Sequence, residues 1–218
     1  MIKTVSNILL MSGLILILLA FGPVIRDEVW YKIKELRSQE YVVSTEINES
    51  ANGSVFSNLL STRPILMNPV NTEFSLVVEK IGVNVPVVAD VSVTDENAYI
   101  EALKNGVAHA SSSPYPSKSA GNVYIFAHAS VNFWKLGKYA TVFNLLRKVE
   151  INDRIHLYYK GEEYIYKVVN VESIPGWNTY PLTRAVIEPT LTLQTCDPPG
   201  TTLSRLVVTA NLIETRVL

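Results

Sequence analysis

Three residues in the second half of the chain have the types and positions needed for nucleophilic chemistry on a carbonyl group. Cys196, the only cysteine among 218 residues, follows the run TLTLQT and precedes Asp197 and a Pro-Pro-Gly turn. His128 ends a second apolar run, VYIFA, and Arg205 opens the run that follows Cys196. A thiol needs help to attack a carbonyl, because little of it is thiolate at neutral pH. A histidine can supply the base, and an arginine can stabilise the oxyanion.

A different interpretation of each residue stays open at this point. An unpaired cysteine is often a small buried hydrophobic residue, and an arginine at a strand start is often a surface residue. His109 lies between a predicted helix and a Pro-containing loop, where it could support the site without touching substrate. His156, in the middle of a predicted strand, is expected to be a surface or packing residue.

The composition excludes several classes of function. Lys+Arg number 19 and Asp+Glu 20, so the net charge of −1 does not provide the cationic surface that nucleic acids require. One cysteine excludes an intrachain disulfide and a cysteine-rich zinc site. The histidines have no HExxH or His-x-His spacing, and the sequence has no GxGxxG, GxxxxGK[ST] or GxSxG pattern. We therefore expect no metal, no cofactor and no nucleic-acid partner.

The elements that must position these residues are mostly short strands. Asp95 is expected to cap a helix that ends at Gly106, a second helical segment is expected at 142–149, and Lys160-Gly161 should form a hairpin turn. Runs rich in Val, Ile, Tyr and Thr predict strands at 74–80, 83–89, 122–128, 154–159, 163–173, 190–195 and 205–212. So many short strands favour a mainly β fold, a barrel or a sandwich.

The beginning of the chain predicts a membrane anchor. Residues 4–25 carry no charged side chain, and as a helix they would span about 33 Å, enough to cross a bilayer core of about 30 Å. Lys3 precedes this run and net negative charge follows it, which places the N-terminus in the cytoplasm and the rest of the chain outside. A cleaved signal peptide is the alternative, although Ala20-Phe21-Gly22 is a poor cleavage site. We expect a cytoplasmic stub and transmembrane anchor at 1–26, a juxtamembrane helix and linker at 27–72, and a catalytic domain at 73–218.

Several of these motifs, in this order, resemble the sortase family of membrane-anchored cysteine transpeptidases. TLQTC (192–196) followed by Arg205 is similar to the family's TLxTC…R signature, and NVYIFAHAS (122–130) to its histidine motif. GVAHA (106–110) and IGVNVPVV (81–88) also match family segments, so the resemblance covers about residues 73–213. It implies an eight-stranded β-barrel with short helices. It also implies that His128, Cys196 and Arg205 are catalytic, and Thr195 is expected to offer its hydroxyl or backbone to the oxyanion or substrate.

The activity that the resemblance implies is transpeptidation at the cell surface. The cysteine would cleave an LPxTG-like sorting signal of a surface protein, form a thioester, and pass the protein to an amine of a cell-wall precursor or of another surface protein. Two alternatives remain from the residues. One is a surface cysteine peptidase that uses water instead of the amine, and the other is a membrane-tethered β-sandwich binding module in which Cys196 is only structural.

Overall fold

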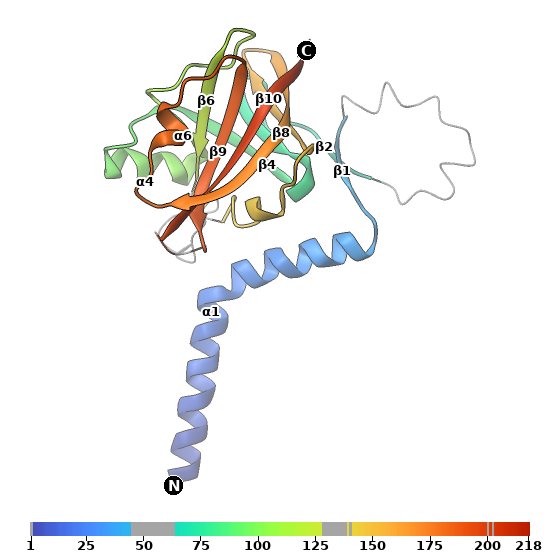
Figure 1. The fold of residues 1–218 in the computed structure, drawn as a ribbon. Coiled ribbons are helices and arrows are strands. Elements are labelled where there is room, and N and C mark those ends of the chain that lie inside the picture. The colour runs from blue at the N-terminus through green and yellow to red at the C-terminus, as the bar shows by residue number, and fades with distance from the viewer. Residues whose placement is uncertain (1, 45–63, 128–138, 140, 200, 202) are drawn as a thin grey trace, which may run out of the picture.

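The computed structural model describes residues 2–44, 64–127, 139, 141–199, 201 and 203–218, and the statements below concern these residues. Eight strands form a closed barrel in the order β10-β8-β7-β3-β4-β5-β6-β9 (Figure 1). They are β3 (Phe74–Val78), β4 (Val83–Val91), β5 (Val107–Ala110), β6 (Gly121–Phe126), β7 (Arg154–Tyr159), β8 (Glu162–Pro175), β9 (Pro189–Asp197) and β10 (Ser204–Val217). The eight-stranded barrel that the resemblance implies is confirmed, and the β-sandwich alternative is wrong because the sheet closes on itself.

Short helices fill the connections between the strands. Asp95 caps α4 (Glu96–Asn105), and its carboxylate accepts hydrogen bonds from the backbone N–H groups of Asn97 and Ala98, as predicted. The helix expected at 142–149 is reduced to turns and a single 3₁₀ turn, η2 (Leu146–Lys148). Another 3₁₀ turn, η1 (Glu79–Ile81), joins β3 to β4, and the one-turn helix α6 (Tyr180–Thr183) lies between β8 and β9.

The barrel interior is filled by alternate side chains of the strands. On β7, Ile155 and Leu157 are fully buried in the main core cluster. The intervening His156, expected to be a surface or packing residue, is fully buried too, and so is Tyr158. The outer face of β7 is covered because a small second sheet packs there, with Val43 lying in one apolar cluster with Tyr158.

That second sheet lies within the stretch expected to be a linker. It consists of β1 (Tyr41–Val43) and β2 (Ile65–Met67), which pair in parallel with Tyr41 opposite Ile65. The two ends of the intervening segment are therefore neighbours on one sheet. The Val43 N–H donates to Glu79 Oε1 at 2.8 Å, which attaches the small sheet to η1.

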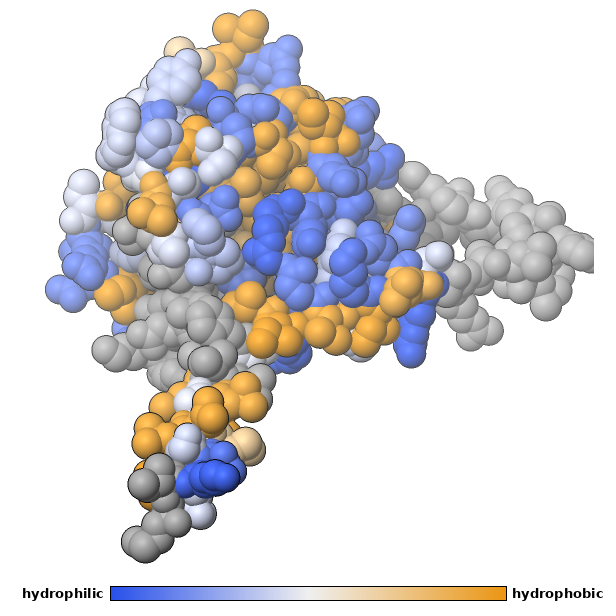
Figure 2. All heavy atoms as spheres, turned by 60° about the horizontal axis from the view of Figure 1, so that its bottom comes forward, coloured by the Kyte–Doolittle hydropathy of each residue, from blue (hydrophilic) through white to orange (hydrophobic). Residues whose placement is uncertain are grey.

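The N-terminal helix α1 (Ile2–Leu36) is bent, and its second part lies against the barrel (Figure 1). Glu28 forms ion pairs with Arg147 and Lys148, and the Lys34 ammonium donates to the Lys80 carbonyl at 2.7 Å. The first part projects from the barrel, and Figure 2 shows hydrophobic residues over much of its surface; Ile8 and Leu10 are examples of exposed side chains there.

The membrane-spanning helix predicted over residues 4–25 is not supported by the structure. In the part of the chain that is described, no helix is both long and apolar enough to cross a membrane. The apolar run is instead the first part of one 35-residue helix whose second part is charged and packs on the barrel.

Candidate active site

Cys196 and Arg205 meet at the end of the β9–β10 ladder. The two residues are directly paired across the strands, and the Arg205 Nη1 donates to the Cys196 sulfur at 3.2 Å. This pairing follows from the turn between them, which returns the chain to the cysteine. A guanidinium in contact with sulfur stabilises the negative charge that a nucleophilic thiolate carries.

The third predicted residue, His128, lies outside the described residues. The chain can be followed to Ala127, which is buried beside β9. The Ala127 N–H donates to the Gln194 carbonyl at 3.1 Å, and its own carbonyl accepts from the Thr195 hydroxyl at 2.9 Å. Both backbone groups of the residue before His128 are thus bonded to the two residues before Cys196.

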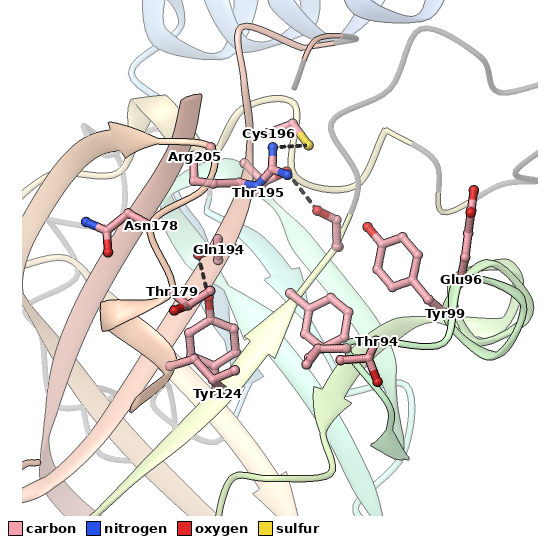
Figure 3. Close-up of a pocket in the computed structure, with 15 residues that line it drawn as sticks. Thr94, Glu96, Tyr99, Tyr124, Asn178, Thr179, Gln194, Thr195, Cys196 and Arg205 are labelled. Carbon is pink, nitrogen blue, oxygen red and sulfur yellow. Dashed lines mark hydrogen bonds between the residues drawn. The ribbon is translucent and has the colours of Figure 1, made fainter. Parts of the chain in front are cut away.

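Cys196 and Arg205 border a cavity of about 530 Å³ on the outer side of β6, β9 and β10 (Figure 3). Apolar side chains supply much of the lining, among them Val93, Tyr99, Phe126 and Leu182. Polar side chains, among them Gln194 and Arg205, also border the cavity, and a cavity of this size with a mixed lining is suited to a short peptide segment.

The comparisons with known proteins agree with this arrangement. A family model described as the sortase domain matches residues 76–213, which is more than half of the chain. The chain belongs to the sortase family. No curated protein matches its sequence significantly.

Solved sortase structures share the fold at low sequence identity. Sortase C1 of GBS pilus island 1 is 24% identical, with a TM-score of 0.54, over 65% of this chain and 64% of that one. For Listeria monocytogenes sortase A the identity is 23% and the TM-score 0.54, over 67% of this chain and 90% of that one. For Streptococcus pneumoniae sortase C the values are 19% and 0.56, over 76% and 77%.

Two tyrosines of this sortase line the cavity and were not singled out in the sequence. Tyr99, on α4, stacks on Phe126 with ring centroids 5.3 Å apart. Burial raises the pKa of Tyr99 above its ordinary value; negative charge at Cys196 raises it further and Arg205 opposes this. Tyr124 donates its hydroxyl to the side-chain oxygen of Gln194, and burial raises its pKa as well. Both tyrosines are therefore neutral hydrogen-bonding groups in the cavity.

Thr195, expected to offer its hydroxyl or backbone to the oxyanion or substrate, precedes Cys196 on β9. Its side chain is buried and its hydroxyl donates to the Ala127 carbonyl, so that proton is engaged within the protein. Thr195 still borders the cavity. Its hydrogen bond links β9, which carries Cys196, to the end of β6, which leads to His128.

The other two histidines of this sortase do not line the cavity with Cys196. His109 is buried on β5, its Nε2 within 3.0 Å of the Ser113 hydroxyl and 3.1 Å of the Pro114 carbonyl. Burial lowers the pKa of His109, so it is neutral at physiological pH. His156, expected at the surface or in packing, is fully buried and makes an ion pair with Glu163 at 2.8 Å.

The cap of α4 provides a first test of how the cavity is built. Replacing Asp95 with alanine leaves two backbone N–H groups of the first turn without their acceptor. We expect a loss of about 1 kcal/mol in the free energy of unfolding, measured by urea denaturation. Asp95→Ser should recover most of that loss, because serine also caps helices. Equal stability of the alanine variant and the wild type would contradict the role of the cap.

Proposed function

We propose that this sortase is a cysteine transpeptidase that cleaves an LPxTG-like sorting signal, holds the protein on Cys196 as a thioester, and transfers it to an amine. The observation that carries the proposal is the contact of the Arg205 guanidinium with the Cys196 sulfur at the edge of a peptide-sized cavity. A cysteine that only packs in a core stays a neutral thiol and needs no cation beside its sulfur, whereas a thiolate is stabilised by one.

The proposed reaction has two acyl-transfer steps. The Cys196 thiolate attacks the threonine carbonyl of the signal, and the bond to the following glycine breaks. His128, as an imidazolium, gives its proton to the leaving amine, and a thioester remains on Cys196. The incoming amine then gives a proton to His128 as it attacks the thioester, which forms the new amide and restores the thiolate. Arg205 holds the oxyanion, since its fork carries five N–H donors and can contact sulfur and substrate together.

The proposed partners are surface proteins that carry a C-terminal sorting signal, and an amine acceptor from a cell-wall precursor or another surface protein. Among the similar structures, one is described as pilus-related and another is discussed for its pilin substrate specificity. We propose the same kind of partner here, with the catalytic domain at 73–218 acting at the cell surface. Thr195 is proposed to contact the substrate through its backbone, since its hydroxyl is already bonded.

Product analysis tests the proposal. The full chain, kept in mild detergent because of its exposed apolar helix, is incubated with a panel of LPxTG-type peptides and a small amine. We expect mass spectrometry to show cleavage after threonine with the amine attached. If only the hydrolysed product forms at saturating amine, the protein is a cysteine peptidase and not a transpeptidase. No product and no adduct on Cys196, from folded protein, would overturn both.

A further inference from the structure

One wall of the cavity comes from the connection between β8 and β9, which has little regular structure of its own. Gly176, Asn178, Thr179 and Leu182 of this connection border the cavity. Its single helical element, α6, has four residues. A helix this short is not stable by itself, so tertiary contacts must hold it in place.

Those contacts form a continuous chain of hydrogen bonds behind the wall. The Arg184 Nη2 donates to the Thr209 hydroxyl at 2.8 Å and to the Thr192 hydroxyl at 3.0 Å. The Thr192 hydroxyl donates to the Asn122 side-chain oxygen at 2.6 Å, and the Asn122 amide donates to the Pro181 carbonyl at 2.8 Å. We call Asn122, Arg184, Thr192 and Thr209 the latch, since they tie both ends of α6 to β6, β9 and β10.

Burial makes the latch strong. Asn122, Thr192 and Thr209 are all buried, with Thr192 fully so. The Thr192 hydroxyl donates its one proton to Asn122 and accepts from Arg184, so both of these hydrogen bonds have the correct direction, while the buried Arg184 Nε has no partner among the described residues. Breaking one link leaves a buried polar group unsatisfied, which costs about 1–3 kcal/mol.

The position of the latch connects it to the cavity. Leu182 lies between the two tied points, Pro181 and Arg184; it packs against the main core cluster and borders the cavity. Thr192 and Cys196 are on the same strand, four residues and therefore about 13 Å apart. Arg184 and Arg205 both lower the pKa of Tyr124, against the larger effect of burial, so Tyr124 lies within the electrostatic reach of both arginines.

We infer that the latch fixes Leu182 as a preformed wall for the acyl-donor peptide, with Arg184 as a positioning residue that acts through Leu182. This inference rests on the proposed function, and it names the residues that set the affinity for the acyl-donor peptide. A wall that is already ordered saves the entropy of ordering it when the peptide binds. Loosening the latch should therefore weaken donor binding without changing the chemistry at Cys196.

Kinetics provide the first test. Arg184→Met and Thr209→Val are assayed with the donor peptide and the amine varied separately. We expect the KM for the donor to rise about tenfold, equivalent to about 1.4 kcal/mol, with kcat and the KM for the amine within about twofold. Arg184→Lys should show a smaller rise in the donor KM than Arg184→Met, because an ammonium can still donate to the two hydroxyls. Alkylation of Cys196 by iodoacetamide should keep its wild-type rate.

Two further variants separate the latch from general loosening. Asn211→Ala is the matched control: it removes a 2.7 Å hydrogen bond from β10 to Glu188, in the same connection but at the exposed surface, and should leave the donor KM unchanged. Leu182→Ala should raise the donor KM, and adding Arg184→Met to it should raise it little more, because the two act through one wall. Additive effects, or a fall in kcat with an unchanged KM, would overturn the inference.

Amide hydrogen exchange tests the latch independently of enzymatic activity. The backbone N–H groups of Leu182 and Arg184 donate within the α6 turn, at 3.0 and 2.8 Å. In Arg184→Met and Thr209→Val these two amides should exchange at least tenfold faster than in wild type, while β9 amides are unchanged. Thr209→Val removes a single hydroxyl, so it can be used for this test if Arg184→Met does not fold. Unchanged exchange would overturn the latch, whereas absent transpeptidation with altered exchange would count against the proposed function alone.

Discussion

Replacing Cys196 with alanine is expected to abolish peptide transfer. In enzymes that use a covalent intermediate, removing the nucleophile lowers kcat by about 10⁵- to 10⁶-fold. The expected result is loss of both the amine-linked product and the thioester adduct, read by mass spectrometry. The fold should be kept, because Cys196 is at the cavity edge and is only partly buried. A Cys196→Ala protein that still transfers peptide would remove the cysteine from the mechanism.

Arg205 variants complete this test. Arg205→Ala should lower kcat by about 10²- to 10³-fold, the usual cost of losing an oxyanion donor. Arg205→Lys should recover only part of it, since an ammonium is a point charge without the planar fork. The control is Arg216→Ala, which removes an arginine on the same strand that pairs with Glu214. Arg205→Ala with wild-type kcat would show that the contact with sulfur has no catalytic consequence.

Replacing His156 with leucine is expected to cost about 3–5 kcal/mol in the free energy of unfolding, the largest effect on stability that the structure predicts. The His156 Nδ1 contacts Glu163 Oε1 at 2.8 Å, and the Tyr158 hydroxyl donates to the same oxygen at 2.7 Å. Glu79 Oε2 lies 3.6 Å from the other ring nitrogen. Without the imidazolium, the fully buried Glu163 carboxylate loses its ion pair and, among the described side chains, keeps the hydrogen bond from Tyr158 and the more distant charge of Arg216.

The same pair makes stability depend on pH. Burial by itself would lower the pKa of His156, but Glu163 and Glu79 outweigh it and raise that pKa to about 9. The contribution of the charged histidine is thus complete below pH 6.5, its ordinary pKa, and is lost as the pH rises through about 9. Glu163 behaves in the opposite sense: burial would raise its pKa, but His156 and Tyr158 lower it, so its contribution is lost only in acid.

Urea denaturation at pH 6 and at pH 9.5 measures both effects. Wild type should be less stable at pH 9.5 by a few kcal/mol, and His156→Leu should lose most of this difference. The double variant His156→Leu/Glu163→Leu should recover much of the stability, because no lone charge stays buried. Glu35→Gln, which breaks the exposed Lys32–Glu35 pair, should change stability by at most about 0.5 kcal/mol. Equal stability of His156→Leu and wild type would show that the pair is not charged.

Much of the barrel could be predicted because its strands have strong local signals. The hairpin at Lys160-Gly161 is confirmed, with both residues at positive φ, and so is the Asp95 cap. Strand β5 was not predicted, because its four residues, VAHA, are too few to show the alternation of apolar and polar side chains that is typical of a strand. The second face of β7 could not be predicted either, because what packs over Tyr158 on that face is a pair of three-residue strands from a stretch that is rich in Ser, Asn and Thr.

Some features of the candidate site could also be predicted from the sequence, and others could not. The pairing of Cys196 with Arg205 could be predicted, because one turn joins the two strands. Tyr99 and Leu182 could not be found, since each reaches the cavity from a connection that only the tertiary fold brings to β9. The roles of His128, Cys196, Arg205 and Thr195 remain predictions.

The parallel pairing of β1 and β2 has a consequence for the distance between α1 and the cavity. A chain segment acts as a spacer only when its ends are free to separate, and the ends of this segment lie on adjacent strands of one sheet. Its contour length therefore does not set how far the cavity sits from α1. Doubling that length would cost about 0.6 kcal/mol in loop-closure entropy. The distance is set instead by the contacts of α1 with the barrel, which are the burial of Tyr31 in the main core cluster, the hydrogen bond of Lys34 to the Lys80 carbonyl, and the ion pairs of Glu28 with η2.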